Sequence, residues 1–251
     1  MATRQESPRA RETRKVEKSR RRQGSPEPAD VQPQRKRLTP QDRRRQILDA
    51  AVQYFAEVGF DGGTRDLAKR LGVTQPLIYR YFPSKDDLIR NVYEEVYVGR
   101  WRTEWEVMLA DRSVPLRMRL IAFYASYVEV IFAHEWMRIY LFSGLRGLGI
   151  NQWWTTFVES HVLGRMCEEL RSENRLPSAQ EVPLQAVEID FVWLFHGGIF
   201  YNGMRRHVYQ SEPHLDIAHT IEVAVDGLMA GFPGVSRKAL AHPADVSGKA
   251  D

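Results

Sequence analysis

Residues 64–82 constrain the fold of this chain more than any other segment, because they have the pattern of two short helices joined by a tight turn. The first helix is expected over residues 64–71, where apolar residues recur at helical spacing. Gly72 permits the sharp turn that ends it. The second helix is expected over residues 75–81, with Pro76 in a first turn that tolerates proline. Two short helices with such a connection predict a helix-turn-helix.

The side chains of this motif fit the positions that a helix-turn-helix provides. Thr64 and Thr74 are suited to cap the first and the second helix. Val73 is expected to fill the corner between the two helices. Ile78 and Phe82 lie four residues apart and are expected to face the core, which leaves the other side chains of the second helix partly or wholly outward.

The outward side chains of the second helix have the chemistry to read DNA. In a helix-turn-helix this helix enters the major groove with its N-terminal residues leading. Gln75 could pair with an adenine edge, Arg80 with a guanine edge, and Leu77 could touch a thymine methyl group. Tyrosine hydroxyls suit phosphates, although Tyr79 and Tyr81 could instead pack against neighbouring helices. We favour DNA contact for Tyr79 and leave both roles open for Tyr81.

The motif and its flanks resemble the N-terminal domain of TetR-family transcriptional regulators. The resemblance covers about residues 43–90 and is carried by residues 45–60, the motif itself and residues 85–88. The stretch over residues 59–67 is one residue shorter than is usual in this family. The resemblance implies that double-stranded operator DNA is contacted by Thr64, Arg65, Thr74, Gln75, Pro76, Leu77, Tyr79, Arg80, Tyr81 and Lys85.

Helical spacing of apolar residues continues beyond the motif, and no segment alternates as a strand would, so we predict an all-α fold. Further helices are expected over residues 40–58, 84–110, 114–134, 136–146, 151–173, 180–208 and 214–231. The breaks between them fall at Pro115, residues 147–149, Pro177, Pro183 and Pro213. Pro183 is expected in a first helical turn, where its missing N–H does no harm.

Charge and apolar content divide the chain into four parts. Residues 1–40 hold 12 Lys/Arg and 5 Asp/Glu, whereas the remainder holds 24 and 27, so the basic character belongs to the N-terminus. We interpret residues 1–38 as a disordered basic arm, either a solvated tail, which we favour, or a source of extra phosphate contacts. Residues 39–86 are expected to form the three-helix DNA-binding domain and residues 87–233 a helical effector-binding and dimerisation domain. Residues 234–251 are expected to be a flexible tail.

The resemblance implies that the C-terminal helical domain binds a small effector and forms a homodimer. Residues 189–201 are compatible with this, because a helix that is apolar all round must be buried on several sides. Together with the last predicted helix, it could form a four-helix bundle with a second subunit. For any one aromatic residue we favour a plain core role. The candidate ligand-binding residues are Trp105, Phe123, Tyr127, Trp153, Phe157, His161, Trp193, His196 and Phe200.

We therefore expect a transcriptional regulator, most simply a repressor that a small, largely apolar or aromatic effector releases from its operator. An activator of the same family and a non-specific DNA-binding protein led by the basic arm are the alternatives. The sequence has no nucleophile–base pair, cofactor fingerprint or spaced metal-ligand set, so neither enzyme activity nor a cofactor or metal is expected. The single cysteine, Cys167, indicates a cytoplasmic protein. No uninterrupted apolar run reaches the ~20 residues of a membrane span.

Overall fold

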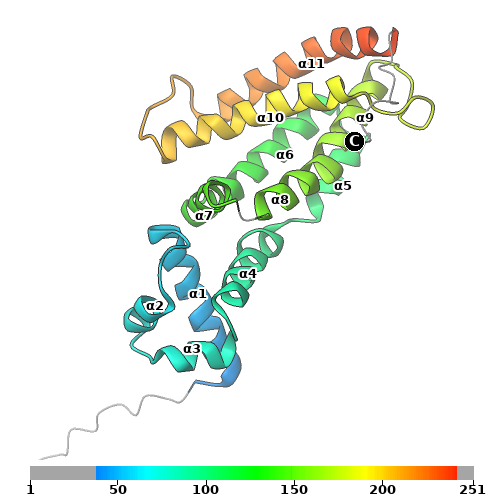
Figure 1. The fold of residues 1–251 in the computed structure, drawn as a ribbon. Helices are drawn as coiled ribbons and strands as arrows, with labels where there is room; N and C mark the ends of the chain where they lie inside the picture. The colour runs from blue at the N-terminus through cyan, green and yellow to red at the C-terminus, as the bar shows by residue number, and fades with distance from the viewer. Residues whose placement is uncertain (1–37, 148, 242–251) are drawn as a thin grey trace, which may run out of the picture. The chain divides into compact units, whose positions relative to one another are not determined.

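The computed structural model describes residues 38–147 and 149–241, and from Pro40 onward these form one compact unit. Every regular element in the described part of the chain is helical, which confirms the predicted all-α class (Figure 1). The predicted basic arm, apart from its last residue, and residues 242–251 of the predicted tail lie outside the described residues.

The first four helices follow the predicted helix-turn-helix arrangement. The first three have the expected bounds, and the core roles predicted for Ile78 and Phe82 are confirmed, since both side chains are buried. Leu67 and Phe55 are buried with them, so one small apolar core holds these helices together. The helices are α1 (Pro40–Val58), α2 (Thr64–Leu71), α3 (Gln75–Tyr81) and α4 (Lys85–Val96).

Two glycines determine the short connection between α1 and α2. Gly59 ends α1 with a φ of +74°, a left-handed conformation that side chains disfavour. A Cβ atom at Gly62 would lie 2.6 Å from side-chain atoms of Tyr54 and of Val58. The connection can be short because no side chain at position 62 separates it from α1. The N-cap of α2 is Gly63, so the prediction that Thr64 caps this helix is wrong by one residue.

The predicted single helix over residues 84–110 is wrong, because the chain leaves the helical path after α4. A 3-10 turn, η1 (Val98–Arg100), follows, and the chain is helical again only in α5 (Glu104–Ala110). Trp101 lies between them with an extended backbone. Its ring packs edge-on against Trp105 and Phe157, at centroid distances of 5.0 and 4.8 Å. Burial of this ring favours the break over a continuous helix.

The centre of the unit is formed by α6 (Leu116–Ile131), α7 (His134–Leu145), α8 (Ile150–Val158) and α9 (Gly164–Glu173). The predicted helix over residues 151–173 is helical throughout, but one π-helical turn, η2 (Glu159–Leu163), separates α8 from α9. At this turn the Ser160 hydroxyl donates to the carbonyls of Thr156 and Phe157, each 3.0 Å away. Such side-chain bonds compete with the regular helical pattern.

The last two helices, α10 (Ala186–His207) and α11 (Ile217–Ala241), lie side by side (Figure 1). Two predictions for this region are wrong. Pro183 lies in the loop before α10, whose N-cap is Gln185 in a capping box with Glu188. Residues 234–241 of the predicted flexible tail are helical, because α11 continues through Pro233. The buried side chains of Phe232 and Ser236 hold this extension in place.

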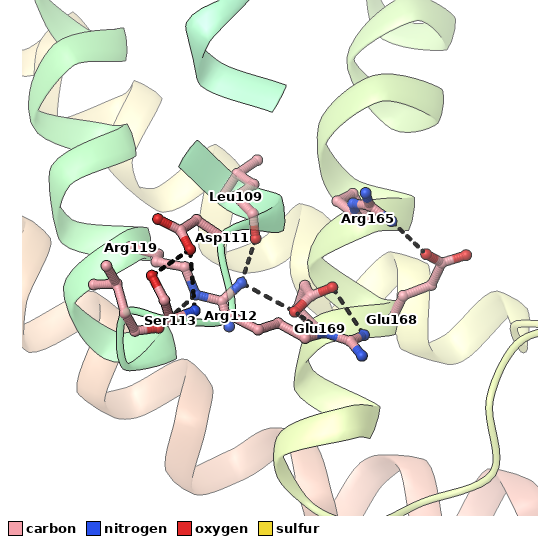
Figure 2. Close-up of polar contacts among 9 residues, drawn as sticks. Leu109, Asp111, Arg112, Ser113, Arg119, Arg165, Glu168 and Glu169 are labelled. Carbon is pink, nitrogen blue, oxygen red and sulfur yellow. Dashed lines mark hydrogen bonds and ion pairs between the residues drawn. The ribbon is translucent and has the colours of Figure 1, made fainter. Parts of the chain in front are cut away.

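Buried ion pairs connect these helices. In the first pair, Arg119 of α6 donates to the carboxylate of Glu169 on α9 at 3.0 Å, and Arg112 joins from the surface (Figure 2). Burial raises the pKa of Glu169, but the hydrogen bonds from these two arginines outweigh it and hold that pKa below its usual value. In the second pair, Arg171 of α9 binds Glu188 of α10, and both are fully buried.

Candidate DNA-binding surface and ligand cavity

The outer face of α3 carries most of the residues that were predicted to contact DNA. Thr74, Pro76, Tyr79 and Arg80 are exposed, and so is Arg65 at the start of α2. The side chains of the remaining α3 candidates, Gln75, Leu77 and Tyr81, are half-buried. Tyr81 packs in part against the core, which agrees with the alternative that it packs against neighbouring helices. Thr74 is the N-cap of α3 by backbone conformation, but its side chain makes no capping hydrogen bond.

Thr64 has a different position from the one that was predicted. Its side chain is only 4% exposed, so it is poorly placed to touch DNA. The Thr64 hydroxyl lies 2.9 Å from the Tyr79 hydroxyl and accepts a hydrogen bond of 2.8 Å from the amide of Gln75. These contacts join the first turn of α2 to two neighbouring turns of α3. Thr64 therefore orients Gln75 and Tyr79 on the outer face of α3.

Lys85 also has an intramolecular partner. Its ammonium donates a 2.6 Å hydrogen bond to the Phe60 carbonyl, in the turn after α1. Ser84 precedes it as the N-cap of α4, and its hydroxyl accepts from the backbone N–H of Asp87 at 3.0 Å. Lys85 thus connects the start of α4 to the end of α1, with its remaining N–H groups available to another acceptor.

A small cavity of about 80 Å³, partly open to solvent, lies among α6, α7, α8 and α10. Four of the predicted ligand-binding residues line it, namely Tyr127, Trp193, His196 and Phe200. Its other lining residues are Ile131, Trp136, Tyr140, Trp154, Thr155, Val158 and Gly197. This volume is below the ~300–1,000 Å³ of typical ligand pockets.

His196 is the buried polar group of this cavity. Its Nδ1 lies 3.0 Å from the Tyr124 hydroxyl, and the imidazole is only 8% exposed. Burial lowers the pKa of His196 to about 4, so the ring is neutral at pH 7. All described residues that line the cavity are then uncharged, which suits an apolar or aromatic molecule.

The other predicted ligand-binding residues lie elsewhere. Trp105 and Phe123 are fully buried in the core, and the Trp105 indole N–H donates to Ser126 at 2.9 Å. The outer side of α8 and of the following turn η2 carries Trp153, Phe157 and His161. The His161 ring stacks on Phe157 at 4.0 Å, outside the cavity.

Sequence reasoning missed Trp136 as a cavity residue. It lies near the start of α7, only two residues after His134, which begins the helix. Its ring stacks on Tyr140 at 5.1 Å, one turn further on. The spacing of these two aromatic residues by four positions was the available signal, because it places both rings on one face of α7.

The family model that matches this chain covers its helix-turn-helix region. The family model described as "Bacterial regulatory proteins, tetR family" matches residues 47–92. The tetracycline repressor protein class A from transposon 1721 of Escherichia coli is 34% identical over 85 residues, which cover 31% of this chain and 39% of that protein. The transcriptional activator FasR of Mycolicibacterium smegmatis is 37% identical over 68 residues, 27% of this chain and 31% of FasR.

The likeness in structure extends over both parts of the molecule. A TetR-like transcriptional regulator from Rhodococcus sp. RHA1 superposes with a TM-score of 0.55 at 18% identity, covering 82% of this chain and 100% of that chain. Residues 47–92 therefore match the TetR family in sequence, and the fold of the chain is similar to that of a TetR-like regulator. The matched segments span less than half the length of these two curated relatives.

Helix α7 has one face on the cavity and another on α1. Trp136 and Tyr140 line the cavity. Between them in sequence, Arg138 donates to the carbonyls of Ala56 and Glu57 at the end of α1. The guanidinium of Arg138 also lies over the Phe142 ring, 5.1 Å from its centroid. One helix therefore contacts both the cavity and the helix that supports the helix-turn-helix.

Helices α10 and α11 present an apolar groove of about 420 Å³ on their outer side. Leu194 on α10 is 75% exposed and Val223 on α11 is 62% exposed. Gly198 and Gly227 also line the groove, and a Cβ atom at either position would meet nothing within 4 Å. Exposed apolar residues gathered in one patch mark an interaction surface.

Within residues 38–147 and 149–241, no group of three or more His, Cys, Asp or Glu residues is arranged to hold a metal ion. None of the helices described there has the length and apolar content needed to cross a membrane.

Proposed function

We propose that this protein is a homodimeric repressor that binds operator DNA through α3 and is released by a small, largely apolar or aromatic effector. The observation that carries the proposal is the outer face of α3, where exposed Tyr79 and Arg80 stand on a helix whose inner face is buried. In this arrangement Arg80 reads a base edge, and Tyr79 and Arg65 contact phosphates. The same proposal places the protein in the cytoplasm, with the DNA.

Loss of the Arg80 side chain is expected to weaken operator binding by about 1–3 kcal/mol, because a guanidinium paired with a base edge contributes about that much discrimination. Fluorescence anisotropy with the protein's own upstream DNA, against a random duplex of equal length, measures this for Arg80→Ala. Arg165→Ala is the matched control, since Arg165 is an exposed arginine on α9. Equal affinity for both duplexes in the wild-type protein would contradict the proposal.

A truncation separates this proposal from non-specific binding by the basic arm. Without residues 1–38 the protein is expected to keep its preference for the operator and to show only a shallower dependence of affinity on salt, since fewer phosphates are neutralised. Loss of all binding in the truncated protein would instead assign DNA binding to the arm. If cells that contain the protein show increased transcription from the operator, the protein is an activator and not a repressor.

We infer that the groove on α10 and α11 is the dimer interface, where two copies pack as a four-helix bundle. Val223→Asp is expected to dissociate the dimer, because a carboxylate at this position loses its water when the interface closes. Sedimentation velocity at micromolar protein should show a monomer. Val107→Asp is the matched control, because Val107 is 70% exposed on α5, away from the groove. A dimer in both variants would exclude this interface.

A further inference from the structure

Four buried polar side-chain atoms lack a hydrogen-bonding partner in the part of the chain that the structure describes, and three of them belong to one aromatic cluster. The fourth is Nε of Arg206 on α10. The three in the cluster are the hydroxyls of Tyr93 on α4 and of Tyr97 at its C-terminal end, and the indole N–H of Trp136 on α7. The three residues are at most 7% exposed. Leaving a buried polar group unpaired costs about 1–3 kcal/mol, so such groups require an explanation.

The cluster separates two hollows. On its inner side lies the cavity of about 80 Å³, which Trp136 and Trp154 line. On its outer side lies a cleft of about 320 Å³ between α4 and α8, lined by Tyr93, Tyr97 and Trp153 among others. The Tyr97 ring closes the space between them, with centroids 5.0 Å from Trp136 and 5.4 Å from Trp154. The outer cleft alone reaches the size of typical ligand pockets.

The chemistry of the inner cavity restricts what can enter. Its described lining residues carry no charged side chain, and an unpaired charge would lose its water there at a large cost in free energy. The Trp136 indole N–H can only donate a hydrogen bond, and a tyrosine hydroxyl can donate as well. A carbonyl oxygen only accepts, so it is complementary to this donor. The flat aromatic walls favour a flat aromatic molecule.

We propose that the effector is an uncharged, flat aromatic molecule with a carbonyl group, which enters at the outer cleft, displaces the Tyr97–Trp154 contact and accepts a hydrogen bond from the Trp136 indole N–H. This inference rests on the proposed effector-binding function and adds the chemical class and the anchoring residue. The occupant would separate α4 from α8 and fill both hollows.

Three probes of one shape test the chemical class. Fluorenone is flat, neutral and carries one carbonyl group. Fluorene has the same ring system without the acceptor, and the carboxylate derivative of fluorenone adds a charge. Isothermal titration calorimetry on the full-length protein gives the affinity of each. Fluorenone is expected to bind, and its carboxylate derivative to bind at least about tenfold more weakly. Absence of fluorenone binding, or equal binding of the carboxylate, would overturn the proposal.

The anchoring residue is tested by the ratio of fluorenone affinity to fluorene affinity. Trp136→Phe keeps an aromatic ring and removes the N–H, so this ratio is expected to fall by about tenfold. Trp105→Phe is the matched control, because Trp105 is equally buried but its N–H is already bonded to Ser126. An unchanged ratio in Trp136→Phe, or an equal fall in Trp105→Phe, would overturn the assignment of the donor.

A second variant keeps the test decisive if Trp136→Phe does not fold. Tyr97→Phe removes one buried hydroxyl and keeps the ring, so it should fold, and it is expected to lower fluorenone affinity by less than about tenfold because the Trp136 donor remains. Tighter fluorenone binding to Tyr97→Phe would place the carbonyl away from this cluster and overturn the proposal. Operator affinity is measured separately, without any probe. If the protein binds its operator but does not bind fluorenone more tightly than the carboxylate derivative, this inference about the effector fails and the proposed DNA-binding function stands.

Discussion

Arg171→Met is expected to lower the free energy of unfolding by about 3–5 kcal/mol, because it leaves the buried Glu188 carboxylate without its counter-ion. Arg171 is fully buried, and its guanidinium donates to the carbonyls of Pro177, Val182 and Pro183 as well as to Glu188. Urea unfolding followed by circular dichroism measures the loss. The variant also leaves these three carbonyls without their donor.

Two further variants isolate the cause of this loss. Arg165→Met is the matched control on the same helix, because Arg165 forms an exposed pair with Glu168, and it should change stability by no more than about 1 kcal/mol. Adding Glu188→Gln to Arg171→Met should recover part of the stability, since the unpaired buried charge is removed. A loss below about 1 kcal/mol for Arg171→Met would show that the buried pair is not a main source of stability.

The second large effect is a loss of stability on acidification that depends on His196. Burial lowers the pKa of His196 to about 4 in the folded protein, against about 6.5 for an exposed histidine. Between these values the unfolded chain binds a proton that the folded protein does not, so stability rises with pH across this window. The expected decrease from pH 6.5 to pH 4 is about 3 kcal/mol.

The variant His196→Gln is the comparison that isolates this titration. Its amide cannot take up a proton, yet it can still bond to the Tyr124 hydroxyl, which His196 contacts at 3.0 Å. Urea unfolding of both proteins from pH 4 to pH 7 gives the difference between them, in which the carboxylates that titrate in both proteins cancel. Parallel pH profiles for the two proteins would exclude His196 as the source.

The helix-turn-helix could be predicted from the sequence because its signals are local. Gly72 at the turn, Pro76 in the first turn of α3 and the apolar pair Ile78 and Phe82 all act within a few residues of themselves. The role of Thr64 could not be predicted in this way. Its hydroxyl meets Tyr79, fifteen positions away, so its burial depends on how α2 packs against α3.

The ligand cavity was harder to predict because helical spacing does not identify which side of a helix is covered. Trp153 and Trp154 are neighbours in sequence, yet the first is half exposed and the second is buried. The π-helical turn at residues 159–163 adds a residue, which rotates the following face by about 100° relative to a regular helix. No residue pattern marked this turn, so the sequence could not relate the helix faces before it to those after it.

The end of α11 shows the same limit for proline. The last helix was predicted to end at residue 231, before Pro233, and a proline inside a helix removes a helical hydrogen bond. Ser236 lies three residues beyond that proline, however, and its hydroxyl donates a hydrogen bond to buried Glu188. A contact with a residue 48 positions away outweighs the local preference.

The position of α7 between the cavity and α1 has a thermodynamic consequence for the proposed repressor. Any change in α7 that an occupant of the cavity favours also acts on the Ala56 and Glu57 carbonyls that Arg138 holds. Linkage requires that the two sites affect each other by the same factor. The operator must therefore weaken effector binding as much as the effector weakens operator binding. Cells with many operator copies would then need a higher effector concentration for release.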